Sequence, residues 1–337
     1  MFALNRSVIG LTVGLALLGA CGASPSEDAT AAPETVETEA AERPTAEELR
    51  AEYAQSVALA QETTGPGSPP LWSLSDEDTT IYIFGTVHLL RPEVDWRFPA
   101  FDEALAASDK VVFEVDMFSA EGEKAYMDEF LPKGMYQDGK TLRGALNDED
   151  EAIIEAGMKA ANIPLDAFNA FEPWMVGVNI GAMQIVADGY DPESGVEKVI
   201  YREALAAEKT FGFLESISDQ ANAFDKMSEA SQIDMLYGTL MTLDSAGKTV
   251  DDMVAEWADG DMEGLAALAA NSGNTQASAE LYERILVKRN RNWIPVIEGF
   301  LEQPGTVFVA AGSAHFAGAD SVILMLEDEG YTVERLN

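Results

Sequence analysis

The sequence predicts an α/β fold, with a mixed β-sheet, a site at the strand ends and a large helical middle section. Short β-branched and aromatic runs near both ends of the domain favour strands, whereas residues 121–279 mostly show the apolar spacing of helices. The chain has only two histidines, His88 and His315, and each closely follows an apolar run. This combination indicates that two distant segments meet at one edge of a sheet.

The predicted domain begins with a β-hairpin. Residues 70–74 alternate apolar and polar side chains, residues 75–78 signal a turn, and residues 79–84 continue as a second strand. A short helix over 101–108 then leads to a β-rich run at 110–116, which matches a buried parallel strand. This β-helix-β order favours an α/β sheet.

Periodic apolar residues predict helices through the middle of the chain, and prolines separate the segments. One long helix is predicted over 278–300, and it carries Arg289 among other basic residues. The other predicted helices cover residues 149–161, 174–187, 196–207, 232–243, 250–258 and 319–328. Further strands are predicted at 211–215, 306–311 and 331–335.

Residues 1–20 are expected to be a lipoprotein signal peptide. Arg6 supplies a positive charge, and the apolar stretch at 7–17 is too short to span a bilayer comfortably. Residues 18–21 resemble a bacterial lipobox, in which the cysteine, here Cys21, is lipidated. An ordinary cleaved signal peptide with a chance cysteine is the alternative. We therefore expect an exported bacterial lipoprotein of the cell envelope, which touches the membrane only through its lipid anchor.

Residues 21–64 are expected to be a disordered acidic tether that contains one short helix. The first part is rich in Ala, Glu, Thr, Pro and Ser and has too little apolar bulk to offset its ordering entropy. Thr45 and Glu48 then form a capping-box pattern for a helix that ends near residue 61. Residues 65–337 remain for a single α/β domain.

Composition excludes several kinds of site. Cys21 is the only cysteine, so the exported domain has no disulfide, thiolate metal cluster or cysteine nucleophile. Residues 65–337 hold 49 acidic and 18 basic side chains, a formal charge of −31. Such a surface repels phosphate backbones, so we expect no nucleic-acid partner. The acidity is explained either by solubility or by attraction of divalent cations.

Both histidines end the same short motif, G-x-x-H, with Gly85 before His88 and Gly312 before His315. Glycine makes up 27 of 337 residues, so chance would place a glycine at both positions in under about 1% of cases. A glycine there lets the backbone turn sharply off a strand. The repeated motif predicts one site assembled from two strand ends.

His88, Glu114 and His315 are the predicted metal ligands. Two imidazoles and a carboxylate form a ligand set for divalent metals such as manganese, cobalt, zinc or iron. A bound metal lowers the pKa of its water and supplies a hydroxide nucleophile. The alternative is that each histidine is a packed residue with one hydrogen bond.

Glu114, Glu215 and Arg289 are the predicted catalytic residues. Glu114 stands within an apolar run and Glu215 follows another, so each carboxylate needs a cation or hydrogen-bond donors if it is buried. Arg289 could orient a carboxylate or stabilise a developing oxyanion. The alternatives are edge-facing acids and a solvated basic helix face.

The chain resembles the TraB/PrgY/GumN group, which includes the TIKI metalloproteases. The resemblance rests mainly on the two G-x-x-H segments and on the strand glutamate Glu114, in order and rough spacing across residues 71–337. Shorter matches support it: Pro173-Trp174, Gly195-Val196-Glu197, Leu214-Glu215-Ser216 with Gln220, Arg289-Asn290 with Trp293, and Gly330-Tyr331-Thr332-Val333. Glu197 stands where much of the family has Asp, and Ser216 where Thr is usual.

The resemblance implies an erythromycin-esterase/ChaN-like fold and, in members of established activity, a divalent-metal hydrolase site. His88, Glu114 and His315 would then hold or serve the metal, with Glu215 and Arg289 as further participants. The leading hypothesis is a lipid-anchored metal-dependent hydrolase that acts on a peptide or a small amide or ester. The alternative is a non-enzymatic envelope protein that sequesters a peptide or haem. A serine hydrolase is disfavoured because G-x-S-x-G is absent.

Overall fold

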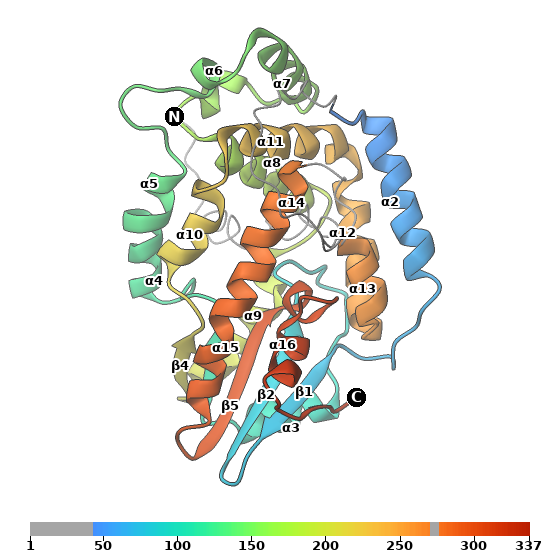
Figure 1. Cartoon of the computed structure of the whole chain (residues 1–337), viewed down its shortest axis with the longest axis vertical. Helices are drawn as coiled ribbons and strands as arrows, with labels where there is room; N and C mark the ends of the chain where they lie inside the picture. The colour runs from blue at the N-terminus through green and yellow to red at the C-terminus, as the bar shows by residue number, and fades with distance from the viewer. Residues whose placement is uncertain (1–42, 270–275) are drawn as a thin grey trace, which may run out of the picture.

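The computed structural model describes residues 43–269 and 276–337. A six-stranded mixed sheet forms one end of the molecule and a helical lobe covers the other end (Figure 1). This architecture confirms the predicted fold class. The expected signal peptide, the lipidation site Cys21 and most of the expected tether lie outside the described residues.

The sheet has the strand order β4-β3-β5-β2-β1-β6. The four neighbours β4, β3, β5 and β2 run parallel, while β1 is antiparallel to both β2 and β6. The predicted hairpin is therefore present as β1 and β2. The strands are β1 Leu71–Ser75, β2 Thr79–Thr86, β3 Lys110–Phe113, β4 Thr210–Phe213, β5 Gly305–Gly312 and β6 Val333–Arg335.

Alternating side chains of the central strands fill two cores on opposite faces of the sheet. Phe84 and Phe308 belong to one core, which helices α3 (Pro99–Ala107), α9 (Val196–Ala206) and α12 (Ala246–Asp259) cover. The other face carries Ile81, Ile83, Val307 and Val309 and packs under α15 (Lys288–Phe300) and α16 (Val322–Asp328). Because both faces are covered, the parallel strands read as nearly continuous apolar runs in the sequence.

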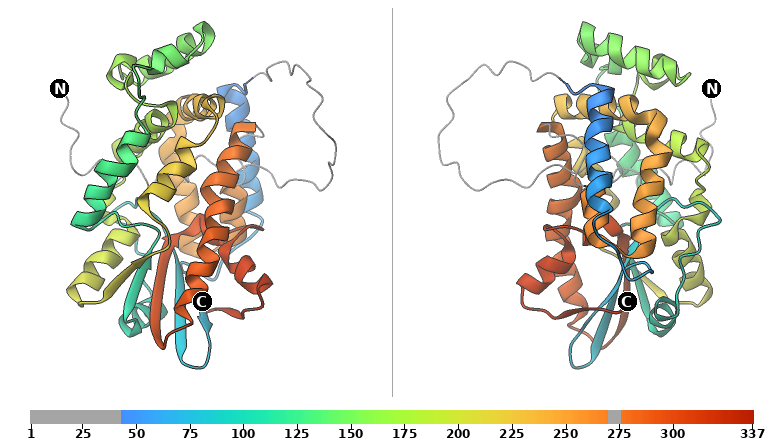
Figure 2. Two further views of the ribbon diagram at one scale, coloured as in Figure 1. Left: turned by 60° about the vertical axis from the view of Figure 1, so that its left-hand side comes forward. Right: turned by 90° about the vertical axis from the view of Figure 1, so that its right-hand side faces the viewer.

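The helical lobe is built around α8 (Pro173–Ala187) and α11 (Glu229–Thr242), which pack on α7 (Asp148–Ala160) at the far end from the sheet (Figure 2). The remaining helices and single turns are α4 Ala120–Ala125, η2 Tyr126–Phe130, α5 Leu131–Lys133, α6 Leu142–Ala145, η3 Leu165–Phe168, η4 Pro192–Ser194, α10 Ile217–Asp225, η5 Leu243–Ser245, α13 Met262–Ala269, α14 Gln276–Tyr282, η6 Glu283–Val287 and η7 Ser313–Phe316.

Helix α2 (Ala46–Ala60) has the predicted capping box, formed by Thr45 and Glu48. It does not stand apart from the domain, because its buried Ala60 joins a small core with Leu265 and Leu268 of α13. The packed body of the protein therefore includes this helix. Across the part of the chain described here, no helix is both long and apolar enough to span a membrane.

The long helix predicted over 278–300 is present but contains an irregular turn. Segments α14, η6 and α15 follow one another without a break, and η6 is a π-helical turn. Such turns widen a helix by one residue and are frequent at functional sites. This one comes directly before the turn that carries Arg289.

Candidate active site

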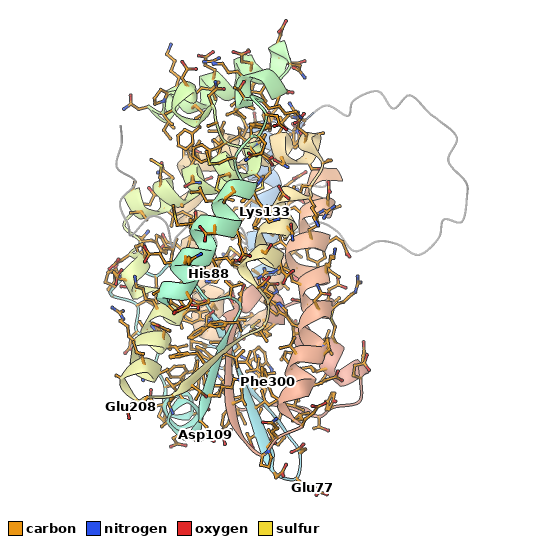
Figure 3. The ribbon with its side chains drawn as sticks, turned by 90° about the vertical axis from the view of Figure 1, so that its left-hand side faces the viewer. Glu77, His88, Asp109, Lys133, Glu208 and Phe300 are labelled. Carbon is orange, nitrogen blue, oxygen red and sulfur yellow. The ribbon has the colours of Figure 1, made fainter. Side chains whose placement is uncertain are left out.

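The two G-x-x-H motifs start at neighbouring positions of adjacent parallel strands. Gly85 of β2 pairs with Ala311 of β5, and Thr86 pairs with Gly312. Strands β2 and β5 end at the same edge of the sheet, so His88 and His315 each follow closely after one of two paired strand ends. Figure 3 shows His88 between the sheet and the helical lobe, far from Asp109 and from the other labelled residues at the amino ends of the strands.

His88 is bound to a glutamate that was not among the predicted site residues. Its Nδ1 lies 2.7 Å from Oε1 of Glu197, and the buried hydroxyl of Thr86 also donates to that oxygen. Glu197 is the second residue of α9, whose start is fixed to the His88 loop by a 3.0 Å hydrogen bond from the Val196 N–H to the Val87 carbonyl. This docking brings the carboxylate to the imidazole.

The close approach of α9 to the His88 loop requires a glycine. A Cβ placed on Gly195 would lie 2.2 Å from the carbonyl oxygen of His88, which is far inside van der Waals contact. Any side chain at this position would push the helix away from the loop. The glycine of the Gly195-Val196-Glu197 segment is thus explained by contact between the helix and the loop.

The pair with Glu197 changes the titration of His88. Burial by itself lowers the pKa of this imidazole, but the charge and hydrogen bond of Glu197 outweigh burial and raise the pKa to about 9. The His88 side chain keeps 25% of its surface exposed, and among the described residues nothing bonds to its Nε2. His88 thus has Nδ1 fixed by Glu197 and a ring that remains partly exposed.

Glu114 follows β3 and is held by donors on both oxygens. The Gly312 N–H donates to Oε1 at 2.7 Å, and Arg289 donates to Oε2 at 2.5 Å. Burial raises the pKa of this carboxyl, but Arg289 first, and then the two nearby histidines and the Gly312 N–H, outweigh that effect and lower the pKa to about 2. Glu114 is therefore ionised, and it joins the end of β3 to the start of the His315 turn.

Arg289 also holds Glu215, which follows β4. Its Nε lies 2.9 Å and its Nη2 2.8 Å from Oε1 of Glu215, while the Trp293 indole donates to Oε2 at 3.1 Å. Burial raises the pKa of Glu215 and the nearby Arg289 opposes that rise. The structure therefore brings Glu114, Glu215 and Arg289 together in one buried cluster.

His315 is fully buried and both ring nitrogens are bonded inside the chain. Its Nδ1 pairs with Oδ1 of Asn290, and its Nε2 lies 3.1 Å from Nη1 of Arg289. A guanidinium can only donate, so Nε2 accepts and Nδ1 carries the proton. Burial and the charge of Arg289 lower the pKa of His315 well below its usual value, so this imidazole is neutral.

The two histidines belong to one electrostatic environment. The pKa of His88 is affected by burial and Glu197 first, and then by the charges of Glu114 and Arg289. The charge of His88 in turn contributes to the low pKa of Glu114. The strand ends thus assemble a solvent-reachable His88–Glu197 pair beside a buried cluster anchored by Arg289.

Comparison with known proteins agrees with this geometry. The family model for the TraB/PrgY/gumN family matches residues 70–335, which include both histidine motifs and every charged residue of the site. The chain belongs to the TraB/PrgY/gumN family. No curated protein and no solved structure matches it.

The predicted metal ligands of this TraB/PrgY/gumN member are brought near one another but are not arranged as a ligand set. Both nitrogens of His315 and both oxygens of Glu114 already have partners, and Arg289 lies between these side chains. Over residues 43–269 and 276–337, no three His, Cys, Asp or Glu side chains are placed to hold a metal ion. The donor set in this arrangement does not fit a metal.

The sequence argument missed Glu197, Thr86 and Asn290 as site residues of this family member. The first two hold His88 and the third holds His315. Glu197 and Asn290 lie in segments that carry the family resemblance, but nothing local in the sequence assigns either one to a histidine partner. Their roles depend on how α9 and α15 dock onto the sheet edge.

Proposed function

We propose that this TraB/PrgY/gumN member is a hydrolase that cleaves peptide or related amide bonds at the His88–Glu197 pair. One observation carries the proposal: a partly exposed imidazole is fixed by a carboxylate through Nδ1, and no described residue bonds to its Nε2. This is the arrangement of a general base with an orienting acid. Membership of the family supports the hydrolytic class.

In the proposed reaction, neutral His88 takes a proton from a water molecule at Nε2 as that water attacks the substrate carbonyl. Glu197 holds Nδ1–H in place and stabilises the imidazolium that forms. The same imidazolium then returns its proton to the leaving amine nitrogen as the C–N bond breaks. Proton transfer by a positioned side chain contributes roughly 10²- to 10⁴-fold to a rate.

The buried cluster has a positioning role in this proposal. The donors of Arg289 are engaged by Glu114, Glu215, His315 and the Ile285 carbonyl, so none is left for an oxyanion. Of its two predicted roles, orientation of carboxylates therefore has the better support. Through Glu114 and Gly312 the cluster fixes β3 against β5, and thereby the edge from which His88 projects.

A divalent metal (manganese, cobalt or zinc) remains a prediction from the sequence and from the resemblance. Binding by His88, Glu114 and His315 would require Arg289 to leave Glu114 and His315 to give up its inner partners. Attachment to the cell envelope through lipidated Cys21 likewise remains a proposal, which would place the site on an exported domain close to a membrane.

The test is hydrolysis of a fluorescence-quenched peptide library by the chain purified without a histidine tag. We expect cleavage by the wild type, its loss in His88→Ala, and its strong reduction in Glu197→Gln. Glu203→Gln is the matched control, because it removes the same charge from the exposed side of α9. Stoichiometric peptide binding without product, or a Soret band after incubation with haem, would favour a non-enzymatic binding protein instead.

A further inference from the structure

In the site, the hydrogen-bond donors have partners inside the chain, whereas some acceptors do not. This difference affects which ligand the site can bind. Every side-chain donor of the buried cluster already has an acceptor inside the chain. Arg289 donates to Glu114, Glu215, His315 and the Ile285 carbonyl. The other engaged donors are the Trp293 indole to Glu215, the Asn290 amide to the Asp320 carbonyl and the Thr86 hydroxyl to Glu197.

Around His88 and Glu114, three polar atoms have no partner among the described residues, and each can accept a hydrogen bond. Both Thr86 and His88 bond to Oε1 of Glu197, and no described residue bonds to its Oε2. Nε2 of His88 is a second such acceptor in the neutral state that the proposed reaction uses, whereas in the imidazolium it is a donor. Oε1 of Gln220 is a third, and it is buried. Since Glu197 is only slightly exposed, a ligand at its Oε2 would be largely shielded from water.

The orientation of the Gln220 amide is set by its neighbour. Its Nε2 lies 3.4 Å from Oε2 of Glu114, which is ionised and can only accept. A flipped amide would place two acceptors against each other, so the Gln220 carbonyl is directed away from Glu114. Oε1 of Gln220 is therefore a buried acceptor without a partner among the described residues.

We infer that the site selects peptides that bring hydrogen-bond donors and positive charge to it, namely basic peptides, and disfavours acidic ones. This inference rests on the proposed function and names its substrate class. A carboxylate or phosphate would find no free donor in the cluster, whereas an ammonium or guanidinium would meet Oε2 of Glu197. The charge of −31 on residues 65–337 attracts the same peptides over a longer range.

Binding can be measured without turnover in a His88→Asn background. The asparagine amide keeps a donor for Glu197 but lacks the basic Nε2, so a bound peptide stays intact. Two fluorescent peptides of equal length are compared by anisotropy, one with lysines and one with glutamates at the same positions. We expect the basic peptide to bind at least about 10-fold more tightly at low salt.

A charge-matched pair of variants separates the site from the general surface field. Adding Glu197→Gln to the background should weaken the basic peptide about 10-fold, because it neutralises the carboxylate that carries Oε2. Adding Glu203→Gln removes one charge from the same helix, at an exposed pair with Arg97, and should change affinity less than about 2-fold. The difference between the two variants should persist at 0.5 M salt, where surface attraction is screened.

The possible results separate this inference from the proposed function. Equal binding of both peptides, or equal effects of the two glutamate variants, would overturn the basic-peptide preference even if the wild type hydrolyses peptides. Binding with the expected preference but no hydrolysis by the wild type would overturn the proposed function and leave the selection in place. Failure of the basic peptide to bind at any salt concentration would overturn the inference as well.

Discussion

Replacement of Glu197 by Gln is expected to lower the pKa of His88 by about two units or more. Burial lowers that pKa, but the charge and hydrogen bond of Glu197, with a smaller contribution from Glu114, raise it from the usual 6.5 to about 9. At about 1.36 kcal/mol per unit this corresponds to roughly 3 kcal/mol of preference for the protonated imidazole. Because 25% of the His88 side chain is exposed, solvent screens part of this energy, and we take two units as the lower figure.

The composition of the chain makes the measurement simple. With only two histidines, a ¹³C-labelled sample gives two ring Cε1–H resonances, and His315 should not titrate because it is buried and neutral. The titrating resonance is then His88, followed by NMR from pH 5 to 10. Glu203→Gln is the control and should leave the midpoint near 9. A midpoint within half a unit of wild type in Glu197→Gln would refute the assignment of the raised pKa to this pair.

The sign of the pH dependence follows from the same shift. The folded-state pKa of His88 lies above its unfolded value, so its contribution to stability is complete below about pH 6.5 and is lost as the pH rises through 9. Activity runs the opposite way, because only the neutral imidazole accepts a proton. If His88 is the base, kcat/KM of the wild type should rise with pH toward about 9. In Glu197→Gln, kcat/KM should level off at a lower pH and at a lower value.

Three further outcomes are expected. Thr86→Val should lower kcat about 10-fold with little change in KM, and Thr86→Ser should keep kcat near the wild-type value. Thr79→Val, at the other end of β2, is the control and should leave kcat unchanged. Equal losses of kcat in both valine variants would contradict a specific role of the Thr86 hydroxyl. Glu114→Gln should destabilise the fold by about 1.5–3 kcal/mol in urea unfolding, because buried Arg289 loses one of its two carboxylate partners and keeps only Glu215. It should also reduce the loss of stability on acidification, since the Glu114 contribution is present above pH 4.5 and is lost as the pH falls through about 2. The metal prediction is tested by mass spectrometry of the wild type and of His88→Ala after dialysis against manganese, cobalt, zinc and iron. If the wild type retains one equivalent of metal and His88→Ala retains none, the buried cluster rearranges around an ion.

The regular elements could be predicted because they depend on local patterns. Alternating or continuous apolar runs located β2 and β5, and the 3.6-residue spacing located the helices of the middle section to within a few residues. The short segments α4 to α6 and the helices α10 and α13 were not predicted. Each spans too few helical turns for a 3.6-residue apolar period to stand out in the sequence. The π-helical turn η6 also has no sequence signature of its own.

The sequence by itself determined which segments approach the site. Two rare histidines after two apolar runs, and a glutamate at the end of a third, must lie at the carboxyl edge of any parallel sheet built from those runs. The tertiary structure alone decided their partners: Glu197 for His88, Arg289 for Glu114 and Glu215, and Asn290 for His315. Periodicity fixes what a side chain faces along its own element, whereas a hydrogen bond between elements depends on how α9 and α15 dock, which no local pattern encodes.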